Sequence, residues 1–244
     1  MTTPSRSAIV LGASGSVGNA LVAELIRSGA FAQIVSLTRR AQPDQRAMAL
    51  ASGTALREVI LPDMTVDAVE SATVDAARHA DGHVVGLSVL GIGAGTGTLT
   101  IDQHRAVDVE LNAAFARGLE ASGRVKHLAF MSAVGANATA STTASGAAGG
   151  ARYNRVKGEA EEAVKAHGPA VVSIFRPSMI IGSQHTPKLL EQLLPLLSFV
   201  TPAKYKSITV TQIARAMIAT SLHPPTTSRI YHYPEMIGGW VGQP

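Results

Sequence analysis

Short apolar segments alternate with longer amphipathic segments along most of this chain, and this alternation limits the folds open to it. The apolar segments are mostly continuous, as in strands that are covered on both faces. Those predicted as strands are Ala8–Leu11, Gln33–Thr38, Arg57–Leu61, His83–Leu90, Lys126–Met131 and Ala170–Phe175. The helices predicted between them are Ser16–Ser28, Gln45–Ser52, Val66–Ala80, Leu99–Ser122 and Arg152–His167. Strand–helix–strand units connect through right-handed crossovers, so the pattern predicts an α/β fold with a doubly wound parallel sheet.

The last third of the chain departs from this alternation. We expect helices over Pro187–Phe199 and Val210–Ser221 and a short strand over Arg229–Tyr233. Residues 178–244 would then form a small substrate-side lobe over the carboxyl ends of the strands, where such sheets bind ligands. No linker divides the chain, so we interpret residues 1–244 as a single domain.

Two segments have unusual composition. Ala133–Ala151 is almost entirely Ala, Gly, Ser and Thr, which predicts a mobile loop. Lys188–Val200 is rich in leucine, lacks a strongly basic face and is interrupted by Pro195. A wall of an apolar substrate pocket, or part of a dimer contact, is a better interpretation of it than a helix on a membrane surface.

Composition excludes several classes of protein. Apolar residues make up 46% of the chain and charged residues 16%, which excludes a disordered protein. No segment has the ~20 consecutive apolar residues of a transmembrane helix, and no signal peptide is visible. The absence of cysteine fits the cytoplasm. The net charge of +4 is dispersed and aromatic residues are only 4%, so we expect a small-molecule partner rather than nucleic acid, and a monomer or homodimer.

Three glycines with a spacing of three follow the first predicted strand. The segment Gly12–Gly18 reads GASGSVG and leads directly into an amphipathic helix. Free N–H groups at such a helix start attract a pyrophosphate, and a missing side chain permits the tight turn and the close approach of the phosphates. An ordinary strand–helix turn is the alternative interpretation. The residues expected around the pyrophosphate are Gly12, Ser14, Gly15, Ser16, Val17 and Gly18.

Basic residues stand at the end of the second predicted strand. A site for NAD places Asp or Glu here to bind both ribose hydroxyls, but this chain has Thr38, Arg39 and Arg40. A guanidinium can bind a 2′-phosphate through parallel hydrogen bonds, whereas a carboxylate would repel it. The pattern therefore predicts NADP(H) as the cofactor, bound through Arg39. The alternative is that both arginines are solvated loop residues, and this interpretation fits Arg40 better than Arg39.

Two further loops are candidates for contacts with the dinucleotide. Asp63, after the third predicted strand, could accept a hydrogen bond from the adenine amino group, with Met64 against the ring. Asp63 could equally cap the following helix, a role for which Thr65 competes. Leu90 and Gly91 end the fourth strand, and a residue without a side chain there allows close contact with the dinucleotide.

Tyr153 and Lys157 are four residues apart at the start of a predicted helix, so they share one face. An ammonium beside a phenol stabilises the phenolate, which helps the phenol to donate a proton to a carbonyl oxygen as hydride arrives. Ser132, at the end of the fifth strand, could bind the same oxygen, or it could only cap a turn. Ser141 and Ser145 are less favoured substitutes for it.

No group of residues has the spacing of a metal site. His79 and His83 are four apart, but His83 begins a predicted strand, so they should not share a helical face. We expect exposed or capping roles for all of the histidines.

Together these motifs resemble an atypical or extended short-chain dehydrogenase/reductase, and more narrowly the Tat-interacting-protein-like subgroup. The resemblance covers about Ile9 to Thr220. It implies a Rossmann fold, NADPH binding through the glycine loop and Arg39, and a Ser–Tyr–Lys site. It also implies that Pro177 and Met179 pass near the nicotinamide. The residues that carry it are Gly12-x-x-Gly15-x-x-Gly18, Thr38-Arg39-Arg40, Asp63, Leu90-Gly91, Tyr153-x-x-x-Lys157 and Phe175–Gly182.

The resemblance predicts an NADPH-dependent oxidoreductase that reduces a small carbonyl compound through Ser132, Tyr153 and Lys157. Many relatives have paired serines at the end of the fifth strand, where this chain has Ser132 and Ala133. The alternative is therefore a non-catalytic NADPH-binding protein that regulates a partner. An enzyme acting on nucleotide sugars is a third, less favoured hypothesis.

Overall fold

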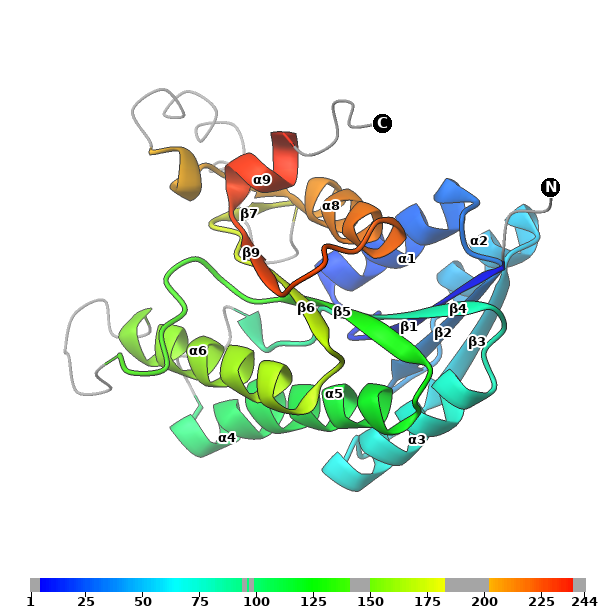
Figure 1. Ribbon diagram of the computed structural model, residues 1–244, viewed down its shortest axis with the longest axis horizontal. Helices are drawn as coiled ribbons and strands as arrows, with labels where there is room; N and C mark the ends of the chain where they lie inside the picture. Colours follow the sequence, from blue (N-terminus) through cyan, green and yellow to red (C-terminus); the bar gives the residue numbers. More distant parts are fainter. Residues whose placement is uncertain (1–4, 94–95, 97–98, 141–149, 183–201, 239–244) are drawn as a thin grey trace.

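The computed structural model describes residues 5–93, 96, 99–140, 150–182 and 202–238. A parallel seven-stranded sheet forms its centre, with the strand order β3-β2-β1-β4-β5-β6-β9 (Figure 1). This order reverses direction between β1 and β4, as a doubly wound α/β sheet does. The predicted fold class is confirmed. The strands are β1 (Arg6–Leu11), β2 (Gln33–Thr38), β3 (Ala55–Ile60), β4 (His83–Ser88), β5 (Val125–Met131), β6 (Val171–Phe175) and β9 (Arg229–Tyr231).

Helices cover both faces of the sheet (Figure 1). One face carries α1 (Ser16–Ser28), α2 (Pro43–Ser52), α8 (Val210–Leu222) and α9 (Tyr233–Gly238). The other carries α3 (Val66–Arg78), α4 (Ile101–Arg105), the π-helical segment η2 (Ala106–Leu111), α5 (Asn112–Ala121) and α6 (Gly150–His167). The shorter elements are β7 (Ile180–Ile181), the 3-10 turn η4 (Ala203–Tyr205) and β8 (Ile208–Thr209).

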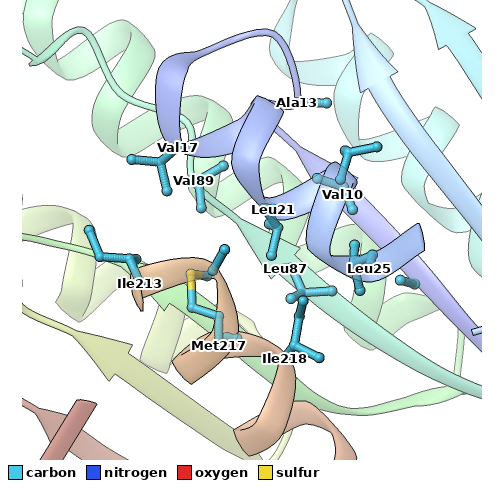
Figure 2. Close-up of a cluster of buried hydrophobic side chains, with 14 of the residues drawn as sticks. Val10, Ala13, Val17, Leu21, Leu25, Leu87, Val89, Ile213, Met217 and Ile218 are labelled. Carbon is cyan, nitrogen blue, oxygen red and sulfur yellow. The ribbon is translucent and has the colours of Figure 1, made fainter. Parts of the chain in front are cut away.

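The C-terminal helix α8 belongs to the hydrophobic core of the sheet. Figure 2 shows Met217 and Ile218 of α8 facing Leu21 and Leu25 of α1, and the side chains of Met217, Leu21 and Leu25 are fully buried. The expectation that residues 178–244 lie over the carboxyl ends of the strands is therefore wrong for α8, whose apolar side chains cover a face of the sheet. The short parallel pair β7 and β8, which was not predicted, links the segment after β6 to the start of α8.

The long helix predicted over Leu99–Ser122 is interrupted. It consists of α4, the π-helical turn of η2 and α5. A π turn inserts a residue without ending the helix, so the chain stays helical through the interruption. Such turns often occur at functional sites.

Other boundaries differ by a few residues. The predicted helix Ser16–Ser28 and strand Gln33–Thr38 are confirmed, and Gly29 caps α1 in the left-handed conformation with a φ of +61°. The predicted strand Arg229–Tyr233 is too long, because α9 begins at Tyr233. The loop Ala133–Ala151 also ends too late, since α6 begins at Gly150. Ser141, Ser145 and the whole of Pro187–Phe199 and Lys188–Val200 lie outside the described residues.

Two histidines contradict the expectation of exposed or capping roles. His104 and His127 are buried within the fold. His127 lies in β5, where its Nε2 is 2.8 Å from the Oγ of Ser173 in β6. Burial and the nearby His83 lower the pKa of His127 to about 4, so the ring is neutral and can occupy the interior. His79 is the C-cap residue of α3, which ends two residues before the predicted Ala80, and His83 begins β4 as predicted.

Within the described residues, no group of three or more His, Asp or Glu side chains is arranged to hold a metal ion. None of the helices described there has the length and apolar character needed to cross a membrane.

Candidate active site

Parallel strands end at the same edge of the sheet, and most of the predicted site residues follow a strand at this edge. The catalytic candidates Tyr153 and Lys157 come from α6 instead. The residues at the edge are Gly12–Gly18 after β1, Thr38 and Arg39 at the end of β2, Asp63 and Met64 after β3, Leu90 and Gly91 after β4, Ser132 after β5, and Pro177–Met179 after β6. This is the edge at which doubly wound sheets bind ligands.

Two of the three glycines in the loop are required by the fold itself. Gly12 has a φ of +89°, and a Cβ there would lie 2.6 Å from the backbone N of Leu90. A Cβ at Gly18 would lie 2.0 Å from the carbonyl O of Gly12. Gly15 differs, because a Cβ there would meet nothing closer than the Gly12 carbonyl O at 3.6 Å. The fold therefore explains Gly12 and Gly18 but leaves open space beside Gly15.

The start of α1 offers backbone donors. Gly15 is the N-cap residue, and because it is a glycine it has no side chain that could cap the first turn. Ser14 is exposed and Ser16 half-buried. The side chain of Val17 points into the core (Figure 2), so only its backbone can face a ligand.

Gln45 of α2 supports the glycine loop and was missed by the sequence analysis. Its Nε2 donates to the carbonyl O of Ala13 at 2.9 Å and to Oδ1 of Asn19 at 2.7 Å. Asn19 in turn donates to the carbonyl O of Ser14 at 3.3 Å. Gln45 is buried although it is a polar residue in a surface helix. The sequence carries no signal for this contact, because the partners are far apart in the chain.

A cavity of about 660 Å³ brings together five of the residues predicted to contact a dinucleotide. Arg39, Asp63, Met64, Leu90 and Gly91 line it. Glu110 of η2 also lines it and was not predicted. The remaining lining residues are Thr65, Val66, Ile92, Ala106, Val107 and Leu111.

The loop after β3 is shaped by its cap and by one strained residue. Thr65, not Asp63, caps α3, since its side chain accepts a hydrogen bond from the backbone N of Ala68. The exposed Asp63 carboxylate is therefore not used as the cap. Met64 has a φ of +43°, which is unusual for a residue with a side chain and is often found at ligand sites.

The two cofactor residues predicted at the end of β2, Thr38 and Arg39, have different surroundings. Thr38 is buried, and its Oγ1 donates to the carbonyl O of Arg40 at 2.9 Å, which shapes the turn. Arg39 and Arg40 are both exposed, but only Arg39 lines the cavity.

Lys157 makes an ion pair that the sequence analysis missed. Its Nζ lies 2.7 Å from Oδ1 of Asp108 in η2, and both side chains are almost completely buried. The Nζ is also 5.9 Å from the centre of the Tyr153 ring. A Cβ at Gly91 would lie 2.8 Å from the Lys157 Nζ and 2.9 Å from Oδ1 of Asp108. Glycine at position 91 therefore makes room for the ion pair.

The ion pair fixes the charge of both partners. Burial alone would raise the pKa of Asp108, but the Lys157 ammonium and hydrogen bonds hold it at about 2. Burial alone would lower the pKa of Lys157, but Tyr153, Asp108 and Glu161 raise it above its usual value. Both groups are therefore charged at neutral pH.

His104 completes a buried group around Tyr153. Its ring stacks on the Tyr153 ring with the ring centres 5.8 Å apart, and its Nε2 is 3.6 Å from Oδ2 of Asp108. Oδ2 of Asp108 also accepts a hydrogen bond from the backbone N of Ile92 at 3.0 Å. Nothing in the sequence indicates that His104, a polar residue in a predicted helix, would be buried against Tyr153.

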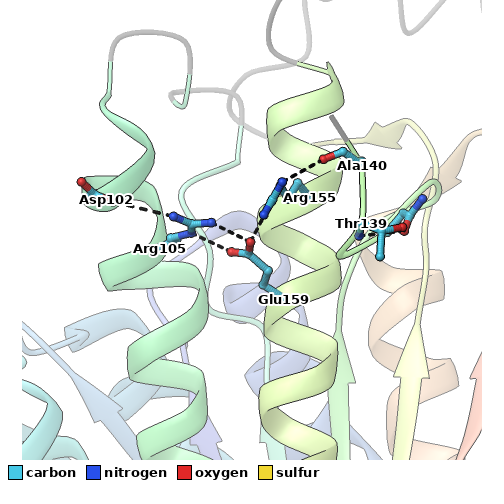
Figure 3. Close-up of polar contacts among 7 residues, drawn as sticks. Asp102, Arg105, Thr139, Ala140, Arg155 and Glu159 are labelled. Atoms are coloured by element: carbon cyan, nitrogen blue, oxygen red, sulfur yellow. Dashed lines mark hydrogen bonds and ion pairs between the residues drawn. The ribbon is translucent and has the colours of Figure 1, made fainter. Parts of the chain in front are cut away.

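A polar network ties α6 to α4 beside this group (Figure 3). Arg105 of α4 donates two hydrogen bonds to Glu159, each of 2.7 Å, and Arg155 donates to the same carboxylate at 2.9 Å. Arg155 also donates to the carbonyl O of Ala140 at 3.4 Å. These contacts fix the first turns of α6, which carry Tyr153, against the helix that carries His104.

The remaining candidates lie at the ends of β5 and β6. Ser132 is buried, and its Oγ has no hydrogen-bond partner among the residues that the structure describes. Pro177 is buried and accepts a hydrogen bond from the backbone N of Val134 at 2.9 Å. Met179 is 45% exposed. No hydrogen bond or ring contact joins these three residues to Tyr153 within the described part of the chain.

The ion pair predicts an asymmetric response to mutation. Lys157→Met should lower the free energy of unfolding by about 3–5 kcal/mol, because it leaves the Asp108 carboxylate buried without a cation. The double variant Lys157→Met with Asp108→Asn should regain most of this loss. Urea denaturation at pH 7 would measure all three proteins. Equal losses in the single and double variants would contradict the ion pair.

No protein-family model matches this chain, and no curated protein is similar to it in sequence. Solved structures are similar to it in fold. A short-chain dehydrogenase/reductase from Serratia marcescens matches 93% of this chain and 97% of its own, with a TM-score of 0.64 and 19% identity. ChuY, an anaerobillin reductase from Escherichia coli O157:H7, matches 92% and 95%, with a TM-score of 0.60 and 15% identity. A short-chain dehydrogenase from Streptomyces avermitilis matches 98% and 93%, with a TM-score of 0.62 and 18% identity.

Fewer than one residue in five is identical in each of these pairs, so the likeness concerns the fold. The chain has the Rossmann-type α/β fold of the short-chain dehydrogenase/reductases.

Proposed function

We propose that this protein is an NADPH-dependent oxidoreductase that transfers hydride to the carbonyl group of a small substrate. The observation that carries the proposal is the position of Gly91. It lines the cavity that holds Arg39, and a Cβ on it would touch the ion pair beside Tyr153. The expected cofactor site and the expected proton donor are therefore neighbours. The structural neighbours include a reductase and dehydrogenases, which supports this class of reaction.

The residues present fit a dinucleotide. Open space beside Gly15 and backbone donors at the start of α1 suit the pyrophosphate. The cavity beyond them would take the adenosine end, with Asp63 and Met64 at its rim and Leu90 and Gly91 along its wall. Thr38 shapes the turn that presents Arg39.

NADPH is preferred over NADH in this proposal because of the end of β2. The acidic residue that would bind both ribose hydroxyls is absent there, since the strand ends in Thr38 and Arg39 follows. The exposed Arg39 guanidinium lines the cavity and could bind a 2′-phosphate. Glu110 lines the same cavity. Its carboxylate would repel the 2′-phosphate and so favour an orientation of the cofactor that keeps this phosphate away from Glu110.

Bound NADPH would supply the hydride. Tyr153 would donate its phenolic proton to the oxygen of the substrate carbonyl. Ser132 would hydrogen-bond that oxygen, a role open to a buried hydroxyl without a partner among the described residues. Pro177 and Met179 would border the nicotinamide. The positive charge of Lys157 would balance the negative charge that Tyr153 carries after it has given up its proton.

The finer assignments remain part of the proposal. We propose a cytoplasmic protein, active as a monomer or homodimer, in which residues 1–244 form one domain and the part of residues 178–244 outside α8 contributes to the substrate side. Membership of the atypical or extended families, and of the Tat-interacting-protein-like subgroup, stays a prediction from the sequence motifs.

Gly15→Ala tests whether the glycine loop binds a cofactor. The structure has room for the methyl group, so the free energy of unfolding should change by no more than about 1 kcal/mol. The methyl group should block the close approach of the pyrophosphate and raise the Kd for NADPH by about tenfold or more. Calorimetric titration and urea denaturation give the two values. Gly18→Ala is the contrasting variant, because it should destabilise the fold itself. Unchanged affinity in a folded Gly15→Ala protein would remove the loop from the site.

Arg39→Ala tests the choice of cofactor. A charge-assisted hydrogen bond to phosphate contributes about 1.5–3 kcal/mol, so the preference for NADPH over NADH should fall by roughly 10- to 100-fold. The Kd values of both cofactors would be measured by titration. Arg40→Ala is the matched control, since Arg40 is exposed but lies outside the cavity, and it should keep the preference. The same preference in both variants would exclude Arg39.

Tyr153→Phe tests turnover. A panel of carbonyl compounds, followed by NADPH absorbance, should identify a substrate for the unmodified protein. The variant should then lose about 10²–10⁴-fold in kcat while binding NADPH normally. Tyr205→Phe, on an exposed tyrosine, should behave like the parent protein. Full activity in Tyr153→Phe would reject the mechanism. Saturable NADPH binding without oxidation by any compound would favour the non-catalytic regulatory protein instead.

A further inference from the structure

The Lys157 ammonium next to Tyr153 is matched by a carboxylate at contact distance. We propose that Asp108 is a positioning residue that neutralises Lys157, so that Tyr153 keeps its proton and the site favours carbonyl reduction over alcohol oxidation. The direction of reaction rests on the proposed function, whereas the effect on the ionisation of Tyr153 does not.

Several contacts hold the Asp108 carboxylate in place. Oδ1 is 2.7 Å from the Lys157 Nζ, and Oδ2 accepts the 3.0 Å hydrogen bond from Ile92. The backbone carbonyl of Asp108 accepts a hydrogen bond from Nδ2 of Asn112 at 2.8 Å. Gly91 leaves the space that the ion pair occupies. Because water is excluded from both side chains, the lysine cannot exchange this carboxylate for solvent.

The other charged groups near Lys157 do not replace Asp108. Glu161 is buried on the same helix, but Arg176 binds its carboxylate with a hydrogen bond of 2.8 Å from Nε and a second from Nη2. His104, from α4, faces Asp108 Oδ2 and the Tyr153 ring. Glu161 is thus balanced by its own cation, and Asp108 is the carboxylate that balances Lys157.

A balanced pair acts differently from a lone ammonium. A lone ammonium near a phenol favours the phenolate, whereas an ammonium with a carboxylate at contact distance presents no net charge. The phenol form is the one that reduction uses. Bound NADPH would supply the hydride for the new C–H bond, leaving NADP⁺, and the carbonyl π electrons would move to oxygen. That oxygen would take the proton from Tyr153, and solvent would later return a proton to the phenolate. Oxidation needs the phenolate first, as a base for the alcohol proton.

The position of Asp108 in the chain supports a specific role. It lies in the π-helical segment η2, and such turns are frequent at functional sites. The turn interrupts what would otherwise be a continuous helix from α4 to α5. Asp108 is thus a buried acid in an irregular helical turn whose other inward-facing residue, Leu111, packs in the core.

The test follows the ionisation of Tyr153 without requiring a substrate. The chain has four tyrosines, so protein labelled with ¹³C at the tyrosine Cζ gives few signals, and Tyr153→Phe assigns the relevant one. In Asp108→Asn this signal should change from phenol to phenolate at a pH lower by about one unit or more than in the parent protein. The double variant Asp108→Asn with Lys157→Met, which carries neither charge, should return to within about 0.3 unit of the parent. The other three tyrosine signals report whether each variant is folded.

Either of two results would overturn the inference. One is that the phenol-to-phenolate transition of Tyr153 in Asp108→Asn occurs at the same pH as in the parent protein, or at a higher pH. The other is a double variant whose transition differs from that of the parent by a full unit, and this second comparison holds even if the single variant does not fold.

A substrate from the carbonyl panel adds the second readout. At pH 7, Asp108→Asn should raise the rate of alcohol oxidation relative to carbonyl reduction by about tenfold, in line with a one-unit change in ionisation. An unchanged ratio would overturn the directional part of the inference. A protein that binds no NADPH would instead refute the proposed function, and the tyrosine titration would still decide the role of Asp108.

Discussion

The close contact between Gly12 and Gly18 is the constraint on which the rest of the site depends. The carbonyl O of Gly12 occupies the space that a side chain at Gly18 would need, so α1 starts immediately beside the end of β1. Gly12 in turn contacts the backbone of the loop after β4. This contact sets the distance between the two strands at which the sheet reverses direction. The loop after β4 that contacts Gly12 also lines the cavity, through Leu90 and Gly91.

A second constraint connects the sheet edge to α6. The Lys157–Asp108 ion pair joins α6 to η2, and the network around Glu159 joins α6 to α4. One connection lies in the interior and the other is partly exposed. Together they fix the first turns of α6 from two sides. Tyr153 is thus placed by polar contacts, while the sheet is held together by apolar packing.

The sequence predicted the fold and the gathering of residues at the sheet edge because both depend on local patterns. Continuous apolar runs identify buried parallel strands, and residues that follow such strands must meet at one edge, as Arg39, Asp63 and Gly91 do. Asp108, His104 and Gln45 could not be predicted. Each is a polar residue in a helix whose burial depends on a partner distant in the chain. The π turn was not predicted, because it changes the hydrogen bonding of the helix locally without ending the helix.

Gly91 ties two properties of the protein to a single position. Its missing side chain serves the wall of the cavity on one side and the buried ion pair on the other. In the proposed function, redesign of the nucleotide preference would start from the exposed Arg39 at the rim of the cavity. A larger residue at position 91 would meet the Lys157–Asp108 ion pair as well as change the wall of the cavity. A substitution at position 91 would therefore change the cavity wall and the surroundings of the ion pair together.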